Sequence, residues 1–178
     1  MTLLNLFQDI LSQKQYLYRA LLLMVLLVIA FLFVRDNGKE AKTKLLSVLR
    51  RPWLAAFFFY MALILTSTVF ARTRINPYRE VFTHFGIFLN GKLNVEFVHN
   101  TLFYIPYSFF FLQAFKPGKP WKAALIVSAA TSLFVELSQL LFWLGQFQFS
   151  DIFHNILGGM IGCAIWCLIE RIRRKRSS

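Results

Sequence analysis

The sequence has few acidic residues and few cysteines. Its 178 residues include 8 Asp and Glu against 20 Lys and Arg, which gives a formal net charge of +12. The two cysteines, Cys163 and Cys167, are one helical turn apart. A disulfide between them within one regular helix would be strained, so the sequence excludes a disulfide framework. We predict apolar filling positions for both thiols, with neither a metal nor a redox role.

The sequence also lacks the common motifs of nucleotide-dependent and metal-dependent enzymes. It contains no Gly-x-Ser-x-Gly, no phosphate-binding loop and no dinucleotide fingerprint, so nothing indicates a nucleotide cofactor. His84, His99 and His154 do not show the His-x-x-x-His or Glu-x-x-His spacing of zinc hydrolase helices. Neighbouring helix residues point about 100° apart, so His154 and Asn155 cannot both face one centre squarely. We predict no metal and no cofactor, and we leave open whether His99 or His154 joins a site.

Long apolar blocks dominate what is present. Hydrophobic residues make up 57% of the chain, including 21 Phe, whereas soluble domains are about 45–50% apolar. A membrane span needs about 20 apolar residues. Five blocks reach or approach that length, at 17–34, 52–70, 97–115, 123–144 and 152–169. The sequence therefore predicts an all-α fold, a polytopic membrane bundle of five transmembrane helices in a single membrane domain that covers residues 1–178.

The first block resembles a signal peptide in having Lys14 and Arg19 ahead of an apolar run. The run is followed by Val34, Arg35, Asp36 and Asn37, which include no small-x-small cleavage site. We therefore interpret it as a retained first span, with a cleaved signal peptide as the alternative.

The basic residues are distributed unevenly between the two sides of the predicted bundle. Fourteen of the 20 Lys and Arg lie in the 35–51 loop, the 116–122 turn and the carboxyl-terminal tail. Cytoplasmic segments carry an excess of Lys and Arg, so this predicts a cytoplasmic carboxyl end and an external amino end. We expect anionic lipid headgroups, and not nucleic acid, to be the partners of these basic segments.

The segment between the second and third blocks is predicted to lie on the outer side. Asn76-Pro77 is a turn signal. Aromatic and aliphatic residues follow at helical spacing and predict a short interfacial helix: Phe82, Phe85, Phe88 and Leu89. Three nearby arginines either contact lipid phosphates or remain solvated at the rim: Arg72, Arg74 and Arg79.

Polar residues occur at matching depth in the last three blocks. Glu136 lies inside the 123–144 block, where a carboxylate costs at least about 2.5 kcal/mol by insertion scales. Gln139 shares its helix face, because the two residues are three positions apart. Asn100 and Tyr104 lie in the first half of the 97–115 block, and Asp151 and Asn155 open the 152–169 block. We predict one ligand-binding pocket, open to the outer half of the membrane, formed by Asn100, Tyr104, Glu136, Gln139, Asp151 and Asn155.

Several polar and small residues of these blocks also have a structural explanation. Polar contact between helices is sufficient to explain Ser128 and Ser132. Ser150 or Asp151 can cap the last helix, and Glu136 can serve as a buried hydrogen-bonding group. Gly158 and Gly162 form a GxxxG step that permits close helix contact. Pro106 removes a backbone donor inside the third block, where we expect a kink.

These polar motifs resemble those of VanZ-like membrane proteins. His99-Asn100-Thr-Leu-Phe-Tyr-Ile-Pro106-Tyr is similar to their Asn-x-x-x-Phe-x-Pro-x-Gly stretch, although Ser108 stands where a glycine is common. Phe134-Val-Glu136-Leu-Ser-Gln139 is similar to their Glu-x-x-Gln stretch. The segment from Ser150 to Gly162 resembles their Asp-x-x-x-Asn-x-x-Gly segment. The resemblance covers roughly residues 52–170, with the 17–34 block as an amino-terminal addition.

The resemblance implies a multi-pass protein of the bacterial cytoplasmic membrane, in a family named for a member linked to teicoplanin resistance. It implies no known reaction. Our first interpretation is a protein that binds an envelope lipid, a cell-wall precursor or a glycopeptide-like ligand in the polar pocket. The alternatives are an intramembrane enzyme with Glu136 or Asp151 as general base, and a transporter or flippase that uses Glu136. The oligomeric state is left open.

Overall fold

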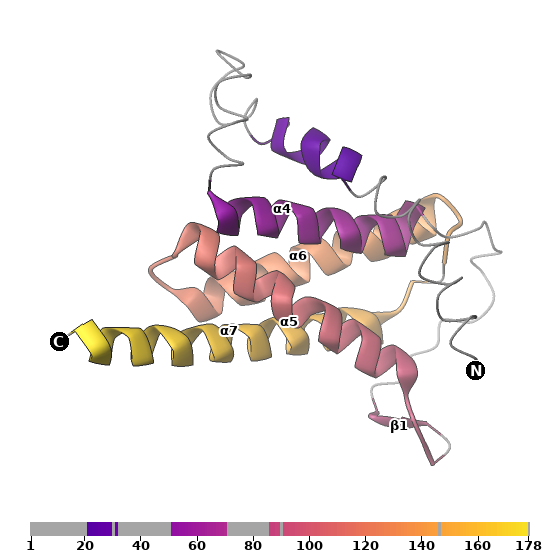
Figure 1. The fold of residues 1–178 in the computed structure, drawn as a ribbon. Helices are drawn as coiled ribbons and strands as arrows, with labels where there is room; N and C mark the ends of the chain where they lie inside the picture. The colour runs from indigo at the N-terminus through magenta and orange to yellow at the C-terminus, as the bar shows by residue number, and fades with distance from the viewer. Residues whose placement is uncertain are drawn as a thin grey trace, which may run out of the picture. The chain divides into compact units, whose positions relative to one another are not determined.

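The computed structural model describes residues 21–29, 31, 51–70, 86–89, 91–145 and 147–177 (Figure 1). Residues 21–29 are helical. The labelled elements follow in the order α4 (Pro52–Leu65), η1 (Thr66–Phe70), β1 (Phe88–Leu89), β2 (Lys92–Leu93), α5 (Val95–Phe115), α6 (Pro120–Leu141) and α7 (Phe149–Ser177). The chain divides into two compact units, Met1–Ala71 and Arg72–Ser178, and α5, α6 and α7 belong to the second.

Three helices of the described part are long and apolar enough to cross a membrane: Pro52–Val69, Pro120–Leu141 and Phe149–Arg176. α5 has 21 residues, but His99, Asn100 and Gln113 lower its mean hydropathy and it is not among the three. The described residues therefore confirm a helical membrane protein with three candidate spans. The arrangement with five spans stays a prediction.

The first unit contains the second predicted span. Pro52 occupies the first turn of α4, where its missing N–H is not needed. The helix continues into the π-helical turn η1, within which the Ser67 and Thr68 hydroxyls donate to the Ile64 carbonyl at 2.9 and 2.7 Å. The Phe31 and Phe58 rings lie 5.3 Å apart. Aromatic packing therefore joins the helical residues before and within α4.

A β-hairpin replaces part of the predicted interfacial helix. Phe88 pairs with Leu93 and Leu89 pairs with Lys92, so the helical prediction is wrong for Phe88 and Leu89. The aromatic spacing suggested a helix, but Asn90-Gly91 is a hairpin turn signal, and Gly91 takes the left-handed conformation with φ 74°. Phe82, Phe85 and the Asn76-Pro77 turn lie outside the described residues, as do Arg72, Arg74, Arg79 and His84.

Asn94 joins this hairpin to α5. Its side-chain oxygen accepts from the backbone N–H groups of Glu96 and Phe97 at 3.1 and 3.4 Å, as a helix cap does. Its side-chain nitrogen donates to the Gly86 carbonyl at 3.2 Å. α5 then runs without interruption through Pro106 to Phe115 and ends at Lys116, which adopts a left-handed φ of 42°.

Local chemistry sets the ends of α6. Pro120 starts the helix in its first turn. At the other end Trp143 takes a left-handed φ of 60°, and the Leu144 N–H donates to the Gln139 carbonyl at 2.8 Å. This is the Schellman arrangement that closes many helices. The helix therefore spans Pro120–Leu141, shifted toward the amino end from the predicted block 123–144.

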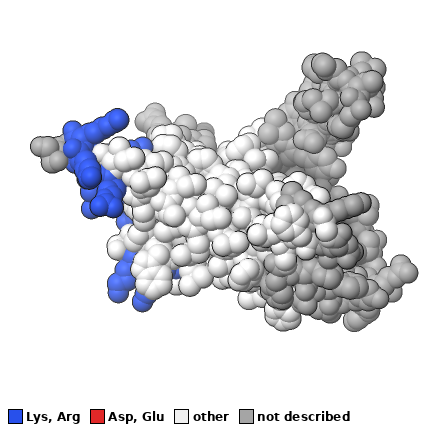
Figure 2. Space-filling view, turned by 90° about the horizontal axis from the view of Figure 1, so that it is seen from below, with Lys and Arg blue, Asp and Glu red and all other residues white. Residues whose placement is uncertain are grey.

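α7 packs against both α5 and α6 (Figure 1). At one end of these three helices a buried cluster consists of Leu112, Ala124, Cys163 and Trp166. Both cysteines are free thiols; Cys163 fills this cluster, and Cys167 is exposed. The same end carries exposed basic residues from the α5–α6 turn and the last turns of α7: Lys116, Lys119, Lys122, Arg171, Arg173, Arg174, Lys175 and Arg176. Figure 2 shows Lys and Arg gathered at one end of the face that it displays.

Candidate functional site

Glycines on α7 set its register against α5. A Cβ atom added at Gly158 would overlap the backbone carbonyl of Thr101, and one at Gly162 would overlap that of Ile105. The Phe97 and His154 rings lie 4.7 Å apart one turn earlier. Positions four residues apart on α7 thus meet positions four residues apart on α5. The two helices therefore run parallel with their backbones in close contact, as the GxxxG step predicted.

α6 runs antiparallel to α7, and small side chains let the two helices approach each other. A Cβ atom at Gly159 would overlap the Ser128 hydroxyl. One turn along, Asn155 Nδ2 donates to Ser132 Oγ at 2.8 Å. The same register continued by one more turn brings Asp151 of α7 to the level of Glu136 of α6. Two carboxyl-bearing residues therefore occupy facing helices at the same depth.

Glu136 is buried, with 2% of its surface exposed. Its Oε2 atom accepts a hydrogen bond of 2.8 Å from the backbone N–H of Gln148, in the turn just before α7. The carboxyl group thus holds the α6–α7 turn against α6. A backbone amide is the partner that the sequence could not identify, because it depends on how the turn folds back.

Tyr104 brings α5 into the same cluster. Its side chain is buried, lies beside Ser132 and is within Coulombic range of both Glu136 and Asp151. Tyr104, Glu136, Asp151 and Asn155 therefore converge from three helices. We name these four residues together with Ser132 the interhelical polar cluster. Ser132 was assigned only to helix adhesion from the sequence, and it is the hydroxyl that accepts the hydrogen bond of Asn155 next to Tyr104.

The remaining predicted site residues lie at the margin of this cluster. Gln139 is buried in the last turn of α6, one turn beyond Glu136. Asn100 is partly exposed, one turn before Tyr104, and makes no side-chain hydrogen bond to the described residues. Asp151 lies in the first turn of α7, which already begins at Phe149. The capping role for Ser150 or Asp151 is therefore wrong, although a carboxylate in a first turn still favours the helix dipole.

Two further features accompany the cluster. Tyr107 is buried on the α5 face one turn along, and its hydroxyl lies 2.6 Å from Thr131 Oγ1 of α6. His154 is buried with 1% exposure between the Phe97 and Phe153 rings, whereas His99 is exposed and faces Phe103. Across the described ranges, no three His, Cys, Asp or Glu side chains are grouped as metal ligands would be. His154 thus packs against aromatic rings beside the cluster.

Buried hydrogen-bonding capacity remains in and around the cluster. The Asn155 Oδ1, Ser128 Oγ and Thr101 Oγ1 atoms are buried and have no hydrogen-bond partner among the described residues. A buried polar atom left in this state costs about 1–3 kcal/mol. These atoms lie on three different helices and border the glycine contacts of α7. They supply acceptors and donors beyond those that hold the helices together.

Comparison with known proteins identifies the family. A family model described as VanZ/LLP1 matches residues 17–170, so the similarity extends from residue 52 back through the first apolar block. No curated protein and no solved structure shows significant similarity. The matched region contains the whole interhelical polar cluster and the helices that form it. Because the match covers most of the chain, the protein belongs to the VanZ/LLP1 family.

Proposed function

We propose that this membrane protein of the VanZ/LLP1 family binds the polar part of an envelope lipid, a cell-wall precursor or a glycopeptide-like molecule at the interhelical polar cluster. The observation that carries the proposal is the convergence of Tyr104, Glu136 and Asn155 from three helices, with hydrogen-bonding atoms left over. A sugar, peptide or amine group offers complementary donors and acceptors. Asn100 and Gln139, at the margin, would extend the same contact surface.

The charge distribution supports an outward position for this site. The interhelical polar cluster lies toward the starts of α5 and α7, whereas eight exposed basic residues gather in the α5–α6 turn and the last turns of α7. Basic residues mark the cytoplasmic side of membrane proteins. The cluster then belongs to the outer half of the bilayer of the cytoplasmic membrane, where precursors and glycopeptides meet the cell. A resistance role toward teicoplanin-type glycopeptides follows from binding at that surface.

Ligand retention by the purified protein tests this function, and the chain offers a matched pair of variants. Asn155→Leu removes a buried amide from the cluster, whereas Gln113→Leu removes a similarly buried amide near the basic end. Gln113 Nε2 also has no partner in the described part of the chain. We expect mass spectrometry to find a lipid or precursor on the wild type and Gln113→Leu, reduced about tenfold on Asn155→Leu. Equal retention by both variants would contradict the proposal.

A second candidate is an intramembrane enzyme of lipid or precursor modification. It is favoured because Glu136 of α6 and Asp151 of α7 lie at the same depth on facing helices. Two carboxyl groups in one buried site can divide acid and base roles. In that case a ligand incubated with the wild type would be converted to a product. Glu136→Gln and Asp151→Asn would each bind the ligand and stop its conversion. Recovery of chemically unchanged ligand from the wild type supports binding alone.

A further inference from the structure

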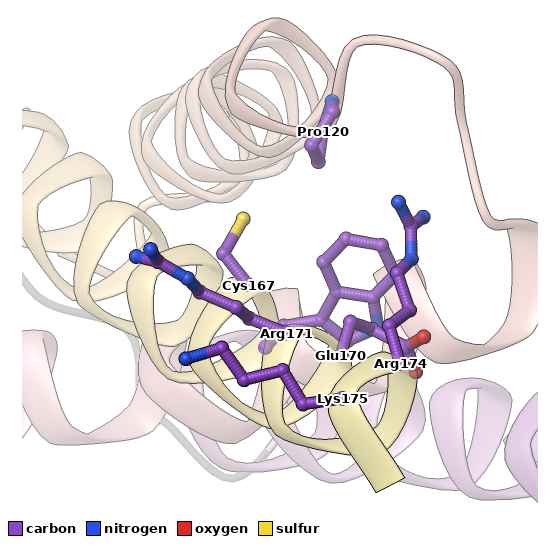
Figure 3. A pocket seen from close by; sticks show the side chains of 7 residues that line it. Pro120, Cys167, Glu170, Arg171, Arg174 and Lys175 are labelled. Carbon is purple, nitrogen blue, oxygen red and sulfur yellow. The ribbon is translucent and has the colours of Figure 1, made fainter. Parts of the chain in front are cut away.

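A second site lies at the opposite end of α6 and α7. A pocket of about 480 Å³ opens between the start of α6 and the last turns of α7, within the range of about 300–1,000 Å³ typical of ligand sites. Its wall includes Pro120, Trp166, Glu170, Arg171, Arg174 and Lys175. Figure 3 shows Arg171 and Arg174 on opposite sides of the pocket, with Pro120 facing them. None of the predicted site residues contributes to it.

The charge of the lining favours an anion. Arg171, Arg174 and Lys175 carry three positive charges against the single carboxylate of Glu170. That carboxylate is already engaged, because Arg173 Nη1 donates to Glu170 Oε1 at 2.9 Å from outside the pocket. Arginine side chains bind phosphate oxygens with charge-assisted hydrogen bonds. The lining therefore matches a phosphate group.

A neutral donor supports the same ligand. Trp166 is 8% exposed, and its indole N–H has no hydrogen-bond partner among the described residues. The indole N–H is a donor only, so it can be satisfied by an oxygen acceptor and not by another cation.

The surroundings of the pocket favour a lipid as the source of the phosphate. Beside the basic residues, α7 exposes Ile165, Leu168 and Ile172. Next to Pro120, Trp121 is half exposed, and Lys122 Nζ lies 5.2 Å from the centre of its ring. Exposed tryptophan and lysine at the end of a span are typical of the lipid headgroup level. The pocket thus sits where apolar helix surface gives way to charge.

We propose that this pocket binds the phosphate of one anionic phospholipid of the inner leaflet, with Arg171, Arg174, Lys175 and the Trp166 N–H as donors. The acyl chains lie along the apolar surface of α7. The site is separate from the interhelical polar cluster, and its occupancy does not depend on what that cluster binds. It gives the basic tail a defined lipid partner in place of a diffuse attraction.

Native mass spectrometry of the full-length protein in neutral detergent tests the proposal. We expect the wild type to retain phosphatidylglycerol in preference to phosphatidylcholine. The double substitution Arg171→Gln with Arg174→Gln should weaken phosphatidylglycerol binding by about tenfold or more. The matched control, Lys122→Gln with Arg176→Gln, removes the same charge from exposed residues outside the pocket and should change binding less than about threefold, since the general attraction is screened.

Further measurements separate the sources of binding. Trp166→Phe keeps a ring in the buried cluster and removes only the N–H, so it should weaken binding several-fold while the thermal midpoint stays within a few degrees. Equal losses in the pocket variant and the control variant would overturn a defined site. Displacement of the lipid by millimolar inorganic phosphate would overturn the lipid assignment, whereas resistance to that displacement supports it.

Discussion

At the scale of single residues, the interhelical polar cluster combines structural bonds with surplus polar atoms. Glu136 Oε2 accepts a hydrogen bond from the Gln148 backbone N–H, and Asn155 Nδ2 donates to Ser132 Oγ. These contacts explain why the helices associate through polar groups inside apolar surroundings. They do not explain why an acid occupies position 136, because a glutamine oxygen could accept the same hydrogen bond without the cost of an ionisable group.

Substitution of Glu136 separates its two roles. Glu136→Gln keeps an acceptor for the Gln148 N–H, so the thermal midpoint should stay near that of the wild type. If the site uses the charge or the proton, ligand retention should fall about tenfold, the scale of one charge-assisted hydrogen bond. Glu136→Leu leaves the Gln148 N–H without its acceptor and should destabilise the fold by about 1–3 kcal/mol. Thermal denaturation and lipid mass spectrometry on the same samples give both quantities.

The control for these variants is Glu96→Gln. Glu96 is an exposed carboxylate in the first turn of α5, so its neutralisation should change neither retention nor the thermal midpoint appreciably. A Glu136→Gln protein that retains ligand as fully as Glu96→Gln would remove Glu136 from the functional residues and leave it a structural hydrogen-bond acceptor.

At the scale of helices, close approach depends on the α7 glycines. Gly162 faces the Ile105 carbonyl so closely that a Cβ atom has no room, and the neighbour is backbone, which cannot rotate away. The parallel packing of α5 against α7 fixes the register of the two helices, and this register places Tyr104 next to the α7 residues of the cluster. A single methyl group should therefore disturb the site at a distance.

Gly162→Ala tests this dependence. Overpacking of this kind typically costs about 1–3 kcal/mol, so we expect a lower thermal midpoint and weaker ligand retention. Gly118→Ala is the matched control, because a Cβ atom there meets nothing within 4 Å. A Gly162→Ala protein as stable as Gly118→Ala would mean that α5 and α7 separate without cost, and the proposed register would be wrong.

The sequence predicted the helices well and their ends less well. Apolar length located α4, α6 and α7, because burial in lipid demands it. The end of α6 depends on Trp143 in a left-handed conformation, where a glycine would have been the expected signal. Phe88 and Leu89 are paired in a hairpin because backbone pairing and the Asn90-Gly91 turn prevail over side-chain spacing.

The candidate site could be predicted in part for similar reasons. Helix periodicity and depth selected Tyr104, Glu136, Asp151 and Asn155, since polar groups within spans face the protein interior. Periodicity could not reveal which atoms meet. The Asn155–Ser132 bond depends on the antiparallel register of α6 and α7, and the Glu136–Gln148 bond depends on the fold of a turn. The phosphate pocket depends on the fold bringing Pro120 and Arg171, which are far apart in the sequence, to the wall of one cavity.

At the scale of the whole molecule, most of the described basic residues and the interhelical polar cluster lie at opposite ends of the second unit. The basic pocket between α6 and α7 lies at one end, and the interhelical polar cluster lies toward the other. Both α5 and α7 carry polar residues near their starts, and α7 carries basic residues in its last turns. Because the two helices run parallel, their polar starts lie at the same end of the unit. This polarity along the helices favours one orientation in the membrane over its inverse.

Topology reporters test that orientation in cells. A reporter fused at Ser178 and one inserted in the loop at Lys39 should both report a cytoplasmic position, because these segments hold the excess of Lys and Arg. A reporter inserted at Gly145, in the α6–α7 turn, should report the external side. The Gly145 reporter also controls for misinsertion, since a correctly spanning α7 must place it opposite Ser178. An external signal at Ser178 would move the interhelical polar cluster to the cytoplasmic half, where it could not meet an extracellular glycopeptide, and the phosphate pocket would then face the outer leaflet.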